Sequence, residues 1–164
     1  MVIRVILLLG LTATCSSCGY TLLQPGVGGG ATILVPPTEN STRWRGVEVQ
    51  FTEAVRSNLQ QLLQLRFSNQ NPDLVLQSSL KEVYRGAPVR GRTGGAIIGT
   101  ATVVLQWTLT DSQGDSVAGG TLEQTLEYLP SGDEDEIQAI EEILDWMAES
   151  VVIKVHAGLD SAAN

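Results

Sequence analysis

The segment ATVVLQWTLT, from Ala101 to Thr110, decides the fold of this chain because apolar and polar residues alternate along it, with Val104 as the one exception. Successive residues of a β-strand point to opposite faces of a sheet, so this alternation predicts a strand with one buried and one polar face. The expected buried face consists of Ala101, Val103, Leu105, Trp107 and Leu109. Trp107 is therefore expected to be a core residue.

The sequence on either side of this strand predicts antiparallel partners. The turn Asp111-Ser112-Gln113-Gly114 follows it directly, and its glycine can supply the positive φ that a tight hairpin needs. In the returning strand, the residues expected to face inward are Ala118, Leu122, Leu126 and Tyr128. An earlier strand runs from Leu74 to Tyr84 or beyond and reaches the central strand through a glycine- and proline-rich turn, Ala87 to Gly95. Such hairpins predict a sheet that is covered on one face.

The N-terminal half of the domain predicts a strand followed by a long helix. Ala31 to Val35 is a short apolar strand, closed by Pro36-Pro37 and followed by a polar turn from Glu39 to Thr42. From Val47 to Phe67, apolar residues recur at steps of three and four, which is the period of an amphipathic helix.

A second helix is expected after Pro130. Ser131 and Glu134 fit a capping box, and Asp133 to Glu136 place negative charge where the helix dipole favours it. The expected apolar stripe is Ile137, Ile140, Leu144, Met147, Val151 and Val155, and the helix is expected to end at His156, before Gly158.

Both helices need an apolar surface, and the inward face of the sheet supplies one. The sequence therefore predicts an α+β fold in the order β-α-β-β-β-α, with two long helices packed on one face of a mainly antiparallel four-stranded sheet. We expect a single domain over residues 31–158 and a disordered tail over residues 159–164.

The first residues form an export signal. A positively charged start, Met1 to Arg4, precedes an apolar run, Val5 to Ala13, that is shorter than the roughly 20 residues of a membrane-spanning helix. We interpret residues 1–17 as a lipoprotein signal peptide, Cys18 as the lipid attachment site with Cys15 as the alternative, and residues 18–30 as a lipidated N-terminus and flexible tether. Acyl chains such as palmitate would then hold the protein at a membrane surface. An ordinary signal peptide with two incidental cysteines is the competing reading.

Composition argues against several classes of function. The net charge is −8, whereas nucleic-acid binding relies on an excess of Lys and Arg. The single histidine, His156, has no Cys or His partners at metal-ligand spacing. The glycine-rich stretch from Gly91 to Gly99 lacks the Gly-Lys-Ser/Thr ending of a phosphate loop. We therefore expect that the protein is not an enzyme and that it binds no metal and no cofactor besides the covalent lipid.

Several segments resemble the LptE family of lipopolysaccharide-assembly lipoproteins. They are Cys18 to Leu22, Ile33 to Pro36, Glu39 to Thr42, the helix Val47 to Phe67, and Asn71 to Leu76. The resemblance implies a non-enzymatic protein of the outer membrane. Its domain would lie in the periplasm or inside the lumen of the β-barrel LptD, as partner and plug of that barrel, and would help to deliver lipopolysaccharide to the outer leaflet.

Candidate contact residues follow from the chemistry of that role. Lipopolysaccharide is polyanionic, so a basic cluster is expected to meet its phosphates or the barrel wall; it consists of Lys81, Arg85, Arg90 and Arg92. These charges would otherwise only solubilise an exposed hairpin. Arg43, Trp44 and Arg45 are candidates for a protein interface, where Trp and Arg are enriched. Alternatively, Trp44 packs across the end of the sheet.

Two other functions remain open on the sequence. One is a lipoprotein accessory that docks on another envelope machine, such as a peptidoglycan synthase or a secretion pore. The other is a tethered periplasmic enzyme, which is disfavoured because the sequence shows no set of polar residues in a catalytic pattern.

Overall fold

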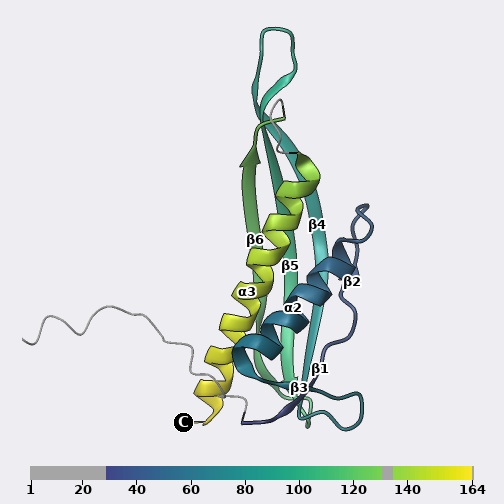
Figure 1. Ribbon diagram of the computed structural model, residues 1–164, viewed down its shortest axis with the longest axis vertical. Helices are drawn as coiled ribbons and strands as arrows, with labels where there is room; N and C mark the ends of the chain where they lie inside the picture. The colour runs from purple at the N-terminus through teal and green to yellow at the C-terminus, as the bar shows by residue number, and fades with distance from the viewer. Residues whose placement is uncertain (1–28, 131–134, 164) are drawn as a thin grey trace, which may run out of the picture.

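The computed structural model describes residues 29–130 and 135–163 (Figure 1). The elements in chain order are β1 (Thr32–Leu34), β2 (Glu39–Asn40), α2 (Val47–Leu63), β3 (Arg66–Phe67), β4 (Leu74–Arg90), β5 (Ala96–Asp111), β6 (Ser116–Tyr128) and α3 (Glu136–Ala163). The predicted signal peptide, the lipid attachment site and the capping box of Ser131 and Glu134 lie outside the described residues.

The sheet is mixed and has six strands in the described residues, so the prediction of a four-stranded, mainly antiparallel sheet is wrong in this detail. β4, β5 and β6 form the predicted antiparallel meander. β1 joins the sheet parallel to both β3 and β4, and β2 pairs parallel to β4. Glu39–Asn40 had been predicted as a turn and Arg66–Phe67 as helix. Two-residue strands are too short to show any periodicity, so only tertiary pairing reveals them.

Helix α2 ends at Leu63, four residues before the predicted end at Phe67. Gln64 adopts a left-handed conformation with φ 57, which turns the chain back toward the sheet. The backbone N–H of Arg66 then donates to the carbonyl of Ala31 at 3.2 Å. Pairing with β1 therefore replaces the last helical turn that the sequence pattern favours.

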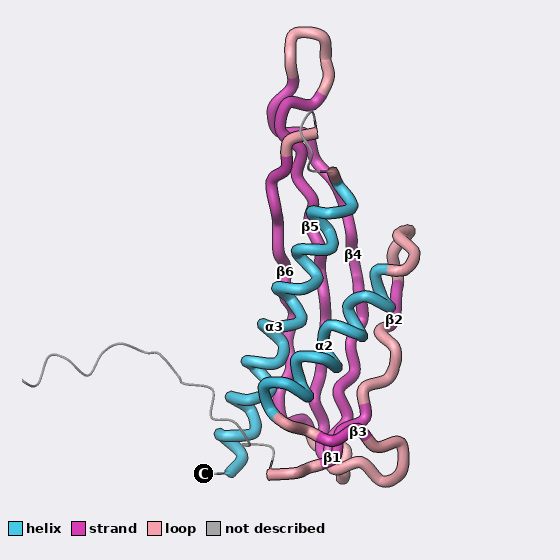
Figure 2. The backbone as a smooth tube through the Cα atoms, in the orientation of Figure 1, coloured by secondary structure: helices cyan, strands magenta, loops and turns pink. Residues whose placement is uncertain are grey.

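The core lies between one face of the sheet and the two helices, as Figures 1 and 2 show. The predicted inward residues of β5 are all buried, with at most 2% of their surface exposed, which confirms that Trp107 belongs to the core. The opposite face of β5 presents mainly polar residues, including Thr102, Gln106 and Thr108. No helix of the described chain covers that face (Figure 2).

Helix α3 differs from its prediction at both ends. Asp135 caps its start, since its Oδ1 accepts the backbone N–H of Gln138 at 2.8 Å, and Ile137 is 58% exposed instead of belonging to the apolar stripe. The helix continues through Gly158 to Ala163, so the predicted end at His156 is wrong, as is the disordered tail over the described residues 159–163. A Cβ on Gly158 would lie 2.8 Å from the Cβ of Ala118, which shows that glycine is needed here for close packing on β6.

Strands β4 and β5 extend beyond the rest of the sheet. Gly99 of β5 pairs with Tyr128, the last residue of β6, so the two strands continue past this point as a two-stranded ribbon (Figure 1). The ribbon turns at residues 91–95, where the N–H of Gly91 donates to the carbonyl of Gly95 at 2.8 Å. The predicted turn, Ala87 to Gly95, is therefore partly strand, because β4 runs to Arg90.

Candidate functional site

The ribbon, which we define as residues 86–100, is the most distinctive surface of the molecule. It projects away from the helices (Figures 1 and 2) and carries Arg90 and Arg92, both exposed. Val89 and Ile97 on it are 41% and 48% exposed. The sequence contains no Asp or Glu between Val83 and Thr110. A chain of net charge −8 thus presents a projecting surface that is both basic and apolar.

A pocket of about 310 Å³ lies at the base of the ribbon and brings together Arg85, Arg90, Tyr128 and Glu136. Nη1 of Arg85 donates to Oε2 of Glu136 at 3.0 Å, which ties the base of the ribbon to the first residue of α3. Burial raises the pKa of the Tyr128 hydroxyl, and the nearby negative charge of Glu136 acts in the same direction. The tyrosine ring lies over Gly99, where an added Cβ would come within 2.5 Å of the ring.

The four predicted basic residues do not form one cluster. Arg85 and Arg90 line the pocket at the base of the ribbon, and Arg92 lies in the turn of the ribbon. Lys81 instead lines a separate groove, described next. Glu136, the carboxylate that holds Arg85, was not among the predicted site residues because α3 is more than 40 residues away in sequence.

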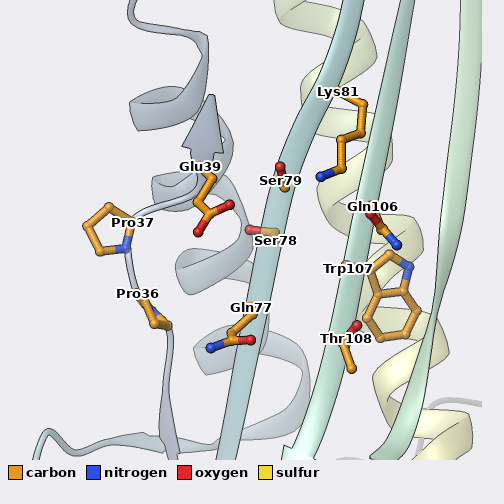
Figure 3. Close-up of a pocket in the computed structure, with 10 residues that line it drawn as sticks. All are labelled: Pro36, Pro37, Glu39, Gln77, Ser78, Ser79, Lys81, Gln106, Trp107 and Thr108. Atoms are coloured by element: carbon orange, nitrogen blue, oxygen red, sulfur yellow. The ribbon is translucent and has the colours of Figure 1, made fainter. Parts of the chain in front are cut away.

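A groove of about 300 Å³ lies where the chain between β1 and β2 runs alongside β4, and it extends across β4 to β5 (Figure 3). We call it the polar groove. One wall is formed by Pro36 and Pro37. The rest of the lining comes from β2, β4 and β5 and is polar except for Trp107: Glu39, Gln77, Ser78, Ser79, Lys81, Gln106, Trp107 and Thr108. Ser79 is only 8% exposed, and its hydroxyl oxygen has no hydrogen-bond partner. Gln77, Ser79 and Lys81 alternate with apolar residues in the sequence of β4, but the strand register that completes the groove depends on β2 and β5.

The predicted interface residues Arg43, Trp44 and Arg45 lie in the turn before α2. The two arginines are exposed, whereas Trp44 is half-buried and packs against the core. Nδ2 of Asn40 donates to the Trp44 carbonyl at 2.5 Å. An interface role for these residues stays a prediction.

A third surface feature lies between the helices. Trp146 of α3 is 42% exposed and borders a shallow hollow together with Ala54, Ser57 and Asn58 of α2. Asp145 and Glu149 flank it on α3. Trp146 is not one of the residues of the apolar stripe predicted for this helix.

The described residues show little that could support metal chemistry or a membrane span. In residues 29–130 and 135–163, no three His, Cys, Asp or Glu side chains are placed to hold a metal ion. His156 lies inside α3 and is 7% exposed, not at the helix end as predicted. Within the same residues, neither helix is apolar enough over a sufficient length to cross a membrane.

Comparisons with known proteins agree with this fold. The model of the LptE family, described as lipopolysaccharide-assembly, matches residues 30–155. A solved structure of a hypothetical protein from Chlamydia trachomatis is similar with a TM-score of 0.62 at 11% identity, covering 86% of this chain and 100% of that one.

Two further solved structures share the fold. A protein from Xanthomonas campestris has a TM-score of 0.58 at 15% identity and covers 81% of this chain and 89% of its own. A lipoprotein from Neisseria meningitidis has a TM-score of 0.52 at 14% identity, with coverages of 76% and 97%. The search of curated proteins found no match.

Proposed function

This chain belongs to the LptE family of lipopolysaccharide-assembly proteins, and from that membership we propose that it is an outer-membrane lipoprotein that acts as partner and plug of an LptD-like β-barrel. In this role it takes part in lipopolysaccharide assembly and transport to the outer leaflet. Cys18 is the proposed lipid attachment site, with Cys15 as the alternative. Mass spectrometry of the mature N-terminus identifies the modified cysteine.

The projecting ribbon is the observation that carries this proposal. Guanidinium groups bind phosphate oxygens through paired hydrogen bonds, and Arg90 and Arg92 are exposed for such contacts. The exposed side chains of Val89 and Ile97 suit an apolar surface, such as acyl chains. Because no carboxylate lies within the ribbon sequence, the local field attracts anions although the whole chain is acidic.

Arg85 has a different role in this proposal. Its guanidinium group is already paired with Glu136 beside Tyr128, so it supports the base of the ribbon. A phosphate bound by Arg90 in the same pocket would compete with Glu136 for Arg85. Lys81, on the polar groove, is the remaining candidate for a contact with lipopolysaccharide or the barrel wall.

Co-purification from the native envelope tests the barrel partnership. A tagged full-length chain, extracted in mild detergent, should retain a large β-barrel protein in about equal molar amount. Recovery of a cytoplasmic-membrane synthase or a secretion pore in place of the barrel would favour the alternative role as an accessory of another envelope machine. Substrate turnover by the purified chain would favour the third reading, a tethered enzyme.

Reversing the charges of Arg90 and Arg92 on the ribbon should weaken lipopolysaccharide binding. Each Lys or Arg near an anionic lipid surface contributes about 1 kcal/mol, so Arg90→Glu with Arg92→Glu should lower the affinity at least about tenfold. Binding of purified lipopolysaccharide to the immobilised protein measures this. The matched control is Lys154→Glu with Arg66→Glu, which changes the net charge equally on exposed sites outside the ribbon. An equal loss in both variants, or no loss in either, would refute a specific role of the ribbon.

A further inference from the structure

The polar groove is built to hold a ligand of its own. We propose that it binds one uncharged, hydroxyl-rich pyranose ring of a glycan. The inference starts from Ser79, which lines the groove, is more than nine-tenths buried and has no hydrogen-bond partner for its hydroxyl. It stands independently of the proposed role of the ribbon.

The unpaired hydroxyl of Ser79 marks a place where a polar group is expected. Buried polar side chains are almost always hydrogen-bonded, and leaving one unpaired costs about 1–3 kcal/mol. Figure 3 shows the amino group of Lys81 directed toward Ser79 from the same strand. Lys81 is exposed and has a long flexible stem, so it can move aside for a ligand hydroxyl.

The side chains around Ser79 select the class of ligand. The amides of Gln77 and Gln106 and the hydroxyl of Thr108 each donate and accept hydrogen bonds, as sugar hydroxyls also do. The charges of Lys81 and Glu39 balance, so the groove does not favour a phosphate. The polar lining also does not suit an acyl chain. An uncharged polyol ring is the ligand that matches this set.

The wall of the groove is held in place before any ligand arrives. On one side of Pro36 and Pro37, Nη2 of Arg56 donates to the carbonyl of Val35 at 2.5 Å. On the other side, the N–H of Thr38 donates to Oγ1 of Thr52 at 2.9 Å, and its hydroxyl shares a hydrogen bond of 2.7 Å with Ser78. Pro36 therefore presents a fixed apolar edge to the C–H face of a sugar, whereas the ring of Pro37 points away from β4 (Figure 3).

The size of the groove fits this ligand. Its volume of about 300 Å³ lies at the small end of the range for ligand pockets, which accommodates a single ring. The groove lies on the sheet face that no helix of the described chain covers (Figure 2). A ring that is part of a longer glycan could therefore enter without its neighbours being enclosed. Two glycans of the envelope contain such rings, the lipid-free core oligosaccharide of lipopolysaccharide and the disaccharide unit of peptidoglycan.

Titration of the soluble domain, from residue 19 onward, with each glycan tests the proposal. Glycan at about 10 mM, tenfold above a weak Kd of about 1 mM, should shift the side-chain amide signals of Gln77 and Gln106 in a saturable way in NMR spectra. The two arms of the titration, core oligosaccharide and peptidoglycan disaccharide, identify the source of the ring. Failure of both to shift these signals would overturn the proposal.

Variants make the test specific to the groove. Gln77→Ala with Gln106→Ala should weaken binding at least tenfold, whereas the same change at two exposed glutamines outside the groove, Gln60 and Gln113, should leave it unchanged. Ser79→Ala should weaken binding without lowering the melting temperature, because it removes a hydroxyl that has no partner in the free protein. Unchanged affinity in the Gln77/Gln106 variant would overturn the assignment.

Discussion

Replacing Phe51 with alanine should lower the free energy of unfolding by about 3–5 kcal/mol, the usual cost of removing a buried aromatic ring. Phe51 lies on α2, is 1% exposed and belongs to the core between the helices and the sheet. A domain of this size is stable by only about 5–15 kcal/mol, so the loss is a large part of the total. Urea denaturation followed by circular dichroism measures it.

Val49 on the same helix provides the matched control. It is 54% exposed, so Val49→Ala should change stability by no more than about 0.5 kcal/mol. A similar loss in both variants would contradict the assignment of the α2 face that carries Phe51 to the core. The Phe51 variant should also loosen the polar groove, because the neighbouring Thr52 holds Thr38 in its wall.

The alternating strand from Ala101 to Thr110 shows what a sequence can predict well. A period of two over ten residues requires one buried face, whatever the partners are, and the structure buries that face throughout. The hairpin at Asp111 to Gly114 was equally predictable, since Gly114 has φ +88 and its N–H donates to the Asp111 carbonyl at 3.1 Å. Both features depend on neighbours in the sequence alone.

The basic cluster could not be predicted in the same way. Lys81 and Arg85 are four residues apart on β4, which in a regular strand would place them on the same face. The strand has a bulge between Leu80 and Glu82, where the register with β5 shifts. After the bulge, Arg85 pairs with the core-facing Ala101, whereas Lys81 lines the polar groove. A bulge depends on the partner strand, so its position was hidden in the sequence.

The final prediction concerns Gly158. At this position, helix propensity and tertiary packing have opposite effects on the stability of a larger side chain. In a helix interior, alanine is favoured over glycine by about 0.8–1 kcal/mol and leucine by slightly less, so Gly158→Leu would be stabilising if only the helix mattered. In the structure, any Cβ at this position would lie 2.8 Å from the Cβ of Ala118 on β6. We therefore expect a net loss of about 1–3 kcal/mol, the usual cost of overpacking, measured by urea denaturation.

Two further substitutions, one at the neighbouring Ala157 and one at Ala118, test whether packing on β6 or helix propensity decides the effect at Gly158. Ala157 is exposed on the same helix, so Ala157→Leu should change stability by no more than about 0.5 kcal/mol. Gly158→Ala should also destabilise, and adding Ala118→Gly should restore part of the loss, because it removes the atom that the new Cβ meets. If Gly158→Leu were instead neutral or stabilising, the C-terminal turns of α3 would not pack on β6, and the helix end predicted from the sequence at His156 would be the better description.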